Sequence, residues 1–307
     1  MNLLVGGTGF VGGHLVEYLF QQGEISKGAF RKGAHLKTMD TNGVQGVEVD
    51  LADHHSLHEA MESVDAVYNL ASPMPYSGSG FMGPNTEGIL NLLEAATEAK
   101  AKCFVHLSTL DVYGFGAGKV DQSRQLRPAG EYQTAKAEAE RLLLEFTKRT
   151  SSPRVTIIRA AKAFGSRDQS IAVPLLKMVE QGRVVVPRGS SMSYTHPRDI
   201  AQAMYRAATG TLATGTSFLV KSFDATPEAL ARGVSSAIGK TPEFKKQGLF
   251  SGPAVSKYAS DQLSASLAID DQPDWSELGY APQFGLKATC DEVAAWYRKE
   301  PWVTEGA

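Results

Sequence analysis

Short apolar runs alternate with amphipathic stretches along the first two-thirds of the chain. Apolar runs of this length are typical of buried strands, and they lie at residues 3–5, 44–49, 66–70, 104–107 and 155–158, with a further strand expected at residues 25–30. Apolar residues recur at helical spacing in the segments between them, at residues 11–21, 53–62, 86–100 and 135–148. This alternation predicts an α/β fold, a Rossmann-type doubly wound parallel sheet with right-handed crossovers.

The regular alternation ends after Arg159, where Pro and Gly interrupt shorter helical patterns. We expect residues 1–160 to form the Rossmann domain, rejoined by about residues 197–220, and residues 161–307 to build mainly a smaller C-terminal substrate-binding lobe. The chain has no internal repeat or low-complexity tract. Its Pro-bearing stretches are typical of loops rather than of an interdomain linker.

Charge and cysteine content narrow the range of partners. Lys plus Arg total 31 and Asp plus Glu total 33, so the chain lacks the excess of basic charge that attracts nucleic acid, and a small-molecule substrate fits better. Cys103 and Cys290 are too few for a disulfide framework and lack paired metal-ligand spacing, so we expect a reducing compartment and no metal. Neither a signal-peptide pattern nor an apolar run of membrane-spanning length is evident, which predicts a cytoplasmic protein without a membrane partner.

Gly6, Gly9 and Gly12 are spaced by three residues between the first predicted strand and the first predicted helix. Without side chains, such a loop turns tightly and approaches a pyrophosphate, which the amide groups at the helix start then hold. An ordinary strand-to-helix turn is the alternative, but the flanking strand and helix favour dinucleotide binding. The expected contacts from this loop are Gly6, Thr8, Gly9, Phe10, Val11 and Gly12.

The end of the second predicted strand bears on which dinucleotide binds. NAD-binding proteins usually carry an acidic residue there, about 20 residues after the glycines, whereas this chain has Arg31 and Lys32. Cations suit a 2′-phosphate, so we expect NADP, with NAD the less favoured cofactor, although two solvated surface charges would give the same pattern. Asp50 and Leu51, which close the third predicted strand, are expected near the adenine.

Tyr132 and Lys136 are four residues apart on a predicted helix and therefore lie on one face of it. A phenol with a reference pKa near 10 must lose about three units, or about 4 kcal/mol, to exchange protons readily at neutral pH. An ammonium about 4 Å away supplies about 4 kcal/mol at an effective dielectric near 20. We therefore expect Lys136 to lower the pKa of Tyr132 and Tyr132 to act as the acid/base, although the bare pattern also arises by chance as an exposed pair.

Two hydroxyl side chains, Ser108 and Thr109, follow the apolar strand at 104–107. They should therefore emerge at the carboxyl end of the sheet, where the glycine loop also opens and where open α/β folds bind ligands. A hydroxyl at this edge can polarise a substrate carbonyl or orient a substrate alcohol. Strand-end capping explains the same residues, and the residues alone do not choose between them.

Taken together, these motifs resemble the extended short-chain dehydrogenase/reductase family, also called the NAD-dependent epimerase/dehydratase family. The resemblance is carried by residues 6–12 (GGTGFVG), 50–51 (DL), 68–71 (YNLA), 85–95 (NTEGILNLLEA), 108–114 (STLDVYG) and 132–136 (YQTAK). It implies that Thr109 is the catalytic hydroxyl, that Lys136 also holds the ribose, and that Asn85 supports the site. It further implies that Leu70, Ala71 and Ser72 contact the cofactor.

Within the family, residues 164–168, 182–185 and 194–201 resemble 3β-hydroxysteroid dehydrogenase-type and related ketoreductases. The implied function is NAD(P)-dependent hydride transfer between the nicotinamide and a secondary alcohol or ketone on a small, apolar substrate. His196 and Asp199 are expected to be scaffolding rather than catalytic. Family members often pair through two helices, which makes residues 86–100 and 135–148 candidates for a homodimer interface.

Two other functions remain open. One is a nucleotide-sugar epimerase or dehydratase with tightly bound NAD(P), although residues 161–165 lack the Asn that many of those enzymes carry there. The other is a cofactor sensor that kept the Rossmann domain without its chemistry. The presence of Thr109, Tyr132 and Lys136 argues against the sensor.

Overall fold

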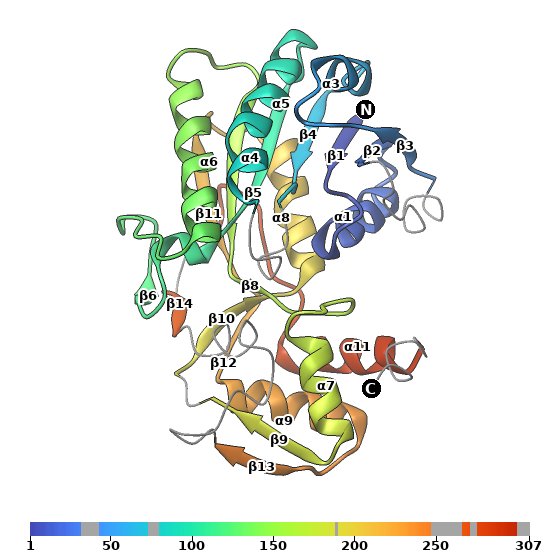
Figure 1. Ribbon diagram of the computed structural model, residues 1–307, viewed down its shortest axis with the longest axis vertical. Coiled ribbons are helices and arrows are strands. Elements are labelled where there is room, and N and C mark those ends of the chain that lie inside the picture. The colour runs from blue at the N-terminus through green and yellow to red at the C-terminus, as the bar shows by residue number, and fades with distance from the viewer. Residues whose placement is uncertain (32–42, 73–79, 188–189, 247–265, 271–274, 300–307) are drawn as a thin grey trace.

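A seven-stranded sheet, in which every pair of neighbouring strands is parallel, runs through one half of the molecule (Figure 1). The computed structural model describes residues 1–31, 43–72, 80–187, 190–246, 266–270 and 275–299. The strands lie in the order β11 (Thr216–Val220), β7 (Arg154–Ala160), β5 (Cys103–Thr109), β4 (Ala66–Asn69), β1 (Asn2–Val5), β2 (Ser26–Phe30) and β3 (Gln45–Glu48). The predicted Rossmann fold class is confirmed.

Helices cover both faces of this sheet. One face carries α1 (Phe10–Gln21) and α8 (Pro197–Thr209), and the other carries α3 (His54–Ala60), α5 (Glu87–Glu98) and α6 (Glu131–Thr147). Successive strand residues alternate between the two cores, as Leu3 faces α5 and Leu4 faces α1. The apolar runs of the sequence are continuous because both faces of the sheet are buried.

Two sequence signals give different starts for α6. The apolar periodicity begins at residue 135, whereas the Tyr132–Lys136 motif predicts a helix that opens at Tyr132, and the helix begins at Glu131. The first turn is polar apart from Tyr132, so apolar periodicity does not reveal it. Tyr132 therefore lies within the first turn of the helix, with Lys136 one turn later.

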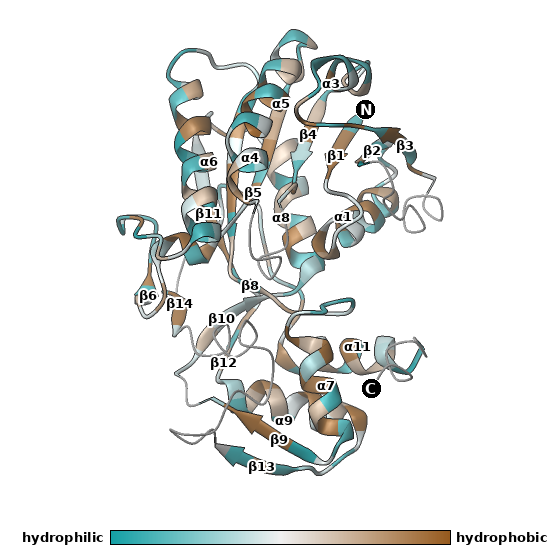
Figure 2. Cartoon of the chain, viewed as in Figure 1, coloured by the Kyte–Doolittle hydropathy of each residue, from teal (hydrophilic) through white to brown (hydrophobic). Residues whose placement is uncertain are grey.

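A smaller lobe with its own apolar core lies at the other end of the molecule (Figure 1). It contains α7 (Ala172–Glu180), α9 (Pro227–Ile238), α11 (Leu286–Lys299) and two small sheets, β8 (Lys162–Ala163) with β10 (Met192–Thr195) and β12 (Phe223–Ala225), and β9 (Arg183–Val186) with β13 (Glu243–Lys246). Strand β9 is mostly hydrophobic and its partner β13 is hydrophilic (Figure 2), so β13 forms the solvent side of that pair. The described helices include none that is both long enough and apolar enough to span a bilayer.

Three short elements complete the description: α4 (Met82–Asn85), the 3₁₀ helix η2 (Leu110–Tyr113), and the two-stranded sheet of β6 (Gly118–Val120) with β14 (Leu267–Ile269). Between β8 and β11 the chain builds part of the lobe and also α8, which packs on α1 of the main sheet. Strand β11 then pairs with β7. The main sheet and the lobe are thus connected by several passages of the chain.

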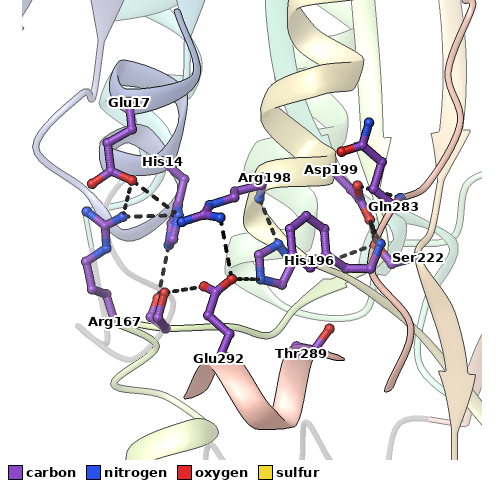
Figure 3. A network of polar contacts seen from close by, with 12 residues as sticks. His14, Glu17, Arg167, His196, Arg198, Asp199, Ser222, Gln283, Thr289 and Glu292 are labelled. Carbon is purple, nitrogen blue, oxygen red and sulfur yellow. Dashed lines mark hydrogen bonds and ion pairs between the residues drawn. The ribbon is translucent and has the colours of Figure 1, made fainter. Parts of the chain in front are cut away.

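A buried histidine joins the start of α1 to the loop that enters the lobe (Figure 3). The Nε2 atom of His14 lies 3.1 Å from the Ser166 carbonyl oxygen, and its Nδ1 atom lies 3.1 Å from an Arg167 guanidinium nitrogen, which also pairs with Glu17 at 2.9 Å. A carbonyl only accepts and a guanidinium only donates, so His14 is neutral with its proton on Nε2. Burial, followed by the charge of Arg167, lowers the pKa of His14 to about 3.

The predicted scaffolding role of His196 and Asp199 agrees with their contacts in the same network. His196 stacks on Phe284 at 3.8 Å between ring centroids, and its Nε2 atom lies 3.2 Å from the Glu292 carboxylate on α11. Asp199 accepts hydrogen bonds from the Ser222 hydroxyl at 2.5 Å and from two backbone amides at residues 283 and 284. The contacts of both side chains join α8 to the lobe and to the segment before α11 (Figure 3).

We expect His14 to make the protein less stable in acid. The unfolded chain binds a proton at His14 near pH 6.5, whereas the folded chain resists it down to about pH 3. Across that window the free energy of unfolding should fall as the pH falls, by up to about 1.4 kcal/mol per pH unit for this one proton. Urea titrations at several pH values should show a shallower dependence for His14→Gln.

His55→Gln is the matched control for that measurement, because the His55 side chain is 83% exposed. Burial also lowers the pKa of His106, so His14→Gln should keep part of the wild-type pH dependence rather than lose all of it. An unchanged pH dependence in His14→Gln would show that His14 is charged in the folded protein.

Candidate active site

A cavity of about 580 Å³ opens at the carboxyl ends of the main-sheet strands. Its wall contains every predicted cofactor contact that the structure describes, namely Gly6, Thr8, Gly9, Phe10, Val11, Gly12, Arg31, Asp50, Leu51, Leu70, Ala71, Ser72, Tyr132 and Lys136. Lys32 lies outside the described residues. The catalytic candidate Thr109 lies on the same wall, whereas Asn85 does not. Motifs spread over more than 130 residues of sequence thus meet at one edge of the sheet.

The glycine loop fits a dinucleotide diphosphate. Gly6 has a φ of +93°, and a Cβ at Gly12 would lie 2.1 Å from the Gly6 carbonyl oxygen, so neither position tolerates a side chain. The first turn of α1 has no side-chain cap at Gly9 and no acidic residue, which leaves its backbone amides available to an anion. These features are the ones that a bound diphosphate requires.

The end of β2 places one cation on the cavity wall. Arg31 directly follows the strand, is exposed, and lines the cavity. Asp50, on the neighbouring part of the wall after β3, accepts a hydrogen bond from the Ala52 amide at 2.9 Å and so stabilises its own turn. Arg31 and Asp50 are thus the charged residues that the described part of the chain places on this stretch of the cavity wall.

Tyr132 is half-buried, and its hydroxyl has no hydrogen-bond partner among the described residues. The ring packs edge-on against Phe81, with the centroids 5.7 Å apart. Burial, and then the nearby Asp111 carboxylate, raise the pKa of Tyr132 above its ordinary value. This corrects the sequence expectation, in which Lys136 lowers that pKa: desolvation by the surrounding protein outweighs the lysine.

Lys136 instead turns toward the sheet. Its Nζ atom donates to the Leu107 carbonyl oxygen at 2.6 Å and lies 3.1 Å from Nε2 of His106. The side chain is 2% exposed, and this burial lowers its pKa to about 7, against the opposing effect of the Glu140 carboxylate. Lys136 is thus a lysine whose charge changes near neutral pH.

The two hydroxyls after β5 have different surroundings. Ser108 donates to the Glu140 carboxylate, which is itself held by Arg159 at 2.7 Å in a buried pair. Thr109 accepts from the Asp111 amide at 3.1 Å, which caps η2 and leaves its own O–H free to donate toward the cavity. These contacts favour Thr109 over Ser108 as the hydroxyl that meets a substrate.

Asn85 lies behind the cavity wall at the end of α4. Its amide nitrogen donates to the Phe81 carbonyl oxygen at 2.9 Å and lies 3.4 Å from the Ser72 hydroxyl, while its oxygen is buried with no partner among the described residues. Phe81 in turn packs on Tyr132. Asn85 therefore acts on the site through Phe81 and Ser72 rather than by direct contact.

Sequence reasoning missed four polar residues around this site. Asn69 and His106 lie directly behind Lys136, and Asp111 and Lys162 form a largely buried ion pair at 3.3 Å on the cavity wall. The signal for Asn69 and His106 was present, since each is a polar residue inside an apolar strand run. Pairing Asp111 with Lys162 requires the fold, because they lie on different segments.

The cysteines take no part in the site. Cys103 and Cys290 are buried, and burial raises the pKa of Cys103 to about 11 and that of Cys290 to about 12, so both remain unreactive thiols. Across the described ranges, His, Cys, Asp and Glu side chains do not gather into a group able to hold a metal ion.

Comparison with known proteins gives a consistent picture. The sequence profile of the NAD dependent epimerase/dehydratase family matches residues 2–219. The chain is 27% identical to the Mus musculus sterol-4-alpha-carboxylate 3-dehydrogenase, decarboxylating, over 59% of this chain and 51% of that protein. The fold is similar to dTDP-glucose 4,6-dehydratase from Bacillus anthracis str. Ames in complex with NAD (TM-score 0.80, 20% identity, 98% of both chains) and to the Thermus thermophilus UDP-glucose 4-epimerase complex with NAD (TM-score 0.80, 21% identity, 97% and 99%).

Proposed function

The chain belongs to the NAD-dependent epimerase/dehydratase family, and from that premise we propose that it transfers a hydride between NAD(P) and a secondary alcohol or ketone on a small substrate. The observation that carries this proposal is the cavity in which the glycine loop, the unpartnered Tyr132 hydroxyl, Thr109 and Lys136 meet. These residues supply a cofactor cradle, a proton donor and a hydrogen-bond donor, the groups that a coupled transfer of a proton and a hydride uses.

Each residue has one task in this proposal. A bound NAD(P) supplies the ring carbon that gives or takes the hydride. Tyr132 donates a proton to the substrate oxygen in reduction and takes it back in oxidation, and Thr109 donates a hydrogen bond to the same oxygen. The raised pKa of Tyr132 keeps it protonated in the free protein, ready to act as an acid. Lys136 holds the cofactor ribose and supplies charge beneath Tyr132.

Apolar residues support an apolar substrate, as in the ketoreductase branch. Ala161, Ala163 and Ile171 contribute apolar surface to the wall where β8 and the start of α7 meet the cavity, beside Lys162 and Ser170. The partial similarity to a sterol dehydrogenase points in the same direction. The test is a screen of ketones with NADPH, in which stoichiometric loss of NADPH absorbance marks the substrate.

A nucleotide-sugar epimerase or dehydratase is the second candidate. It is favoured by the whole-length similarity to two enzymes whose substrates are nucleotide sugars. In an epimerase the hydride removed from the sugar returns to it, so no cofactor is consumed overall. Conversion of a nucleotide sugar with substoichiometric cofactor would therefore replace the first candidate by the second.

NADP is the cofactor we propose, because Arg31 follows β2 and lines the cavity, and a cation at this strand end suits a 2′-phosphate. Arg31→Ala should weaken NADPH binding by about 10- to 100-fold, the loss of one charge-assisted hydrogen bond or pair, and should leave NADH binding nearly unchanged. Fluorescence titration with each nucleotide measures this. Arg141→Ala, which removes an exposed arginine on α6, is the control. If the wild-type protein bound NADPH and NADH equally tightly, the proposed preference for NADP would be wrong.

A further inference from the structure

Three buried polar side chains form a row of contacts behind the cavity. Asn69 ends β4, His106 lies within β5 and Lys136 lies on α6, and their exposed fractions are 2%, 0% and 2%. The Asn69 amide nitrogen is 3.2 Å from Nδ1 of His106, and Nε2 of His106 is 3.1 Å from Nζ of Lys136. Because these groups are buried, a donor or acceptor among them that lacks a matching partner cannot hydrogen-bond to water instead.

The backbone amide of Ala71 determines which group donates and which accepts in each hydrogen bond of this row. The Ala71 amide donates to the Asn69 side-chain oxygen at 3.0 Å, and a backbone N–H can only donate. The Asn69 nitrogen therefore faces His106 as a donor, so Nδ1 of His106 is the acceptor. A neutral His106 then carries its proton on Nε2 and directs it at Lys136.

An Nε2–H group needs an acceptor, and only an uncharged lysine amine has one. The ammonium form has three N–H donors and no lone pair, so it would place a donor against a donor at 3.1 Å. An uncharged amine accepts from His106 and still donates to the Leu107 carbonyl oxygen. All the contacts in the row are then satisfied.

We propose that Asn69 and His106 are positioning residues that keep Lys136 an uncharged amine in the cofactor-free protein and couple its charge to the Ala71 amide in the cofactor cradle. Ala71 lines the cavity, and its nitrogen would lie 2.9 Å from a Cβ placed at Gly6. Because the Asn69 side chain joins the Ala71 amide to His106, and His106 contacts Lys136, a change in the hydrogen bond of the Ala71 amide is passed on to Lys136. The meaning of this coupling for catalysis rests on the proposed function.

The surrounding charges are consistent with this state. The Glu140 carboxylate, one turn along α6, favours the lysine ammonium, but Arg159 and Ser108 hold it from β7 and β5. Asp111 is paired with Lys162, and Tyr132 is protonated. Burial lowers the pKa of Lys136 to about 7, and burial followed by the charge of Lys136 lowers the pKa of His106. No titratable group other than Lys136 contacts His106 within the described part of the chain.

Nitrogen-15 NMR of the histidine rings in the cofactor-free protein tests the first half of the proposal. His106 should show an unprotonated Nδ1 and a protonated Nε2 at about pH 8 to pH 9, where Lys136 is uncharged, with its signals assigned by their loss in His106→Gln. The Lys136 amine, assigned by its loss in Lys136→Met, should titrate near pH 7. A His106 protonated on Nδ1, or a Lys136 still charged at about pH 9, would overturn the proposal.

Asn69→Asp tests the direction of the row. An aspartate keeps an acceptor for the Ala71 amide but presents a second acceptor to His106, so the ring should switch its proton to Nδ1 and offer Nε2 to a lysine ammonium. The titration of Lys136 should then move up by about one pH unit or more. An unchanged tautomer in folded Asn69→Asp would contradict the coupling. These spectra need no turnover, so a failed hydride assay with the expected tautomers would remove only the proposed function.

Discussion

Tyr132→Phe should lower kcat by about 10²- to 10⁴-fold while NAD(P) binding stays within about twofold of wild type. The substitution removes one oxygen atom and keeps the ring that packs on Phe81. The hydroxyl makes no hydrogen bond to the described residues, so its loss costs the fold little. What disappears is the proton donor at the substrate oxygen. Steady-state kinetics with the best ketone, together with fluorescence titration of NADPH, separates the two effects.

Tyr205→Phe is the control for Tyr132→Phe. Tyr205 lies on α8 and packs its ring against Tyr18, outside the cavity wall. Removal of the Tyr205 hydroxyl should leave kcat unchanged. If Tyr132→Phe kept full biological activity while a glycine-loop variant lost it, the protein would be a cofactor sensor and the assignment of Tyr132 as acid/base would be wrong.

The fold could be predicted from the sequence because burial imposes a pattern of apolar positions on strands and helices. Strands covered on both faces are mostly apolar along their length, and residues 66–70 and 155–158 show this, with single polar residues at Asn69 and Thr156. Helices packed on one side must repeat every three to four residues, which located α1 and α5 to within a residue or two. Where the first turn of α6 is polar, apolar periodicity begins four residues late, and the Tyr132–Lys136 motif gives the start to within one residue.

The site was accessible in part because parallel strands bring their ends to one edge. The glycine loop, Thr109 and Tyr132 lie on such ends or on the helices beside them, so topology alone gathers them. The pKa values of the site residues could not be predicted in the same way, since the pKa of a group depends on what surrounds it in three dimensions. Desolvation of Tyr132 and the turn of Lys136 toward His106 reverse the expected interaction of the pair.

Substrate choice is the least accessible feature of the sequence. The cavity wall on the lobe side comes from short segments such as Lys162–Ala163 and from single residues of helices, including Ile171 and Ile200. Such segments carry no periodic signal, because each contributes one or two side chains to the wall. Asp111 and Lys162 show the result, since they form an ion pair across 51 positions of sequence.

Gly12→Ala should weaken NAD(P) binding by about 10- to 100-fold and destabilise the fold by about 1–3 kcal/mol. A single methyl group at this position would lie 2.1 Å from the Gly6 carbonyl oxygen and 2.8 Å from the Gly7 Cα, both of which are backbone atoms. Because no side chain can rotate away, either α1 or the loop must move, and both form the diphosphate cradle. Fluorescence titration with NADPH and a thermal melt measure the two effects.

Gly285→Ala is the matched control for Gly12→Ala, because a Cβ there meets nothing within 4 Å and the residue lies in the lobe before α11. It should bind NADPH as the wild type does. The two measurements also separate a packing role of Gly12 from a role in cofactor binding. If Gly12→Ala were less stable but bound NADPH normally once folded, the only role of Gly12 would be to let α1 pack closely. Loss of binding in a folded Gly12→Ala protein, with Tyr132→Phe still binding, would instead assign the glycine loop to the cofactor and Tyr132 to the proton.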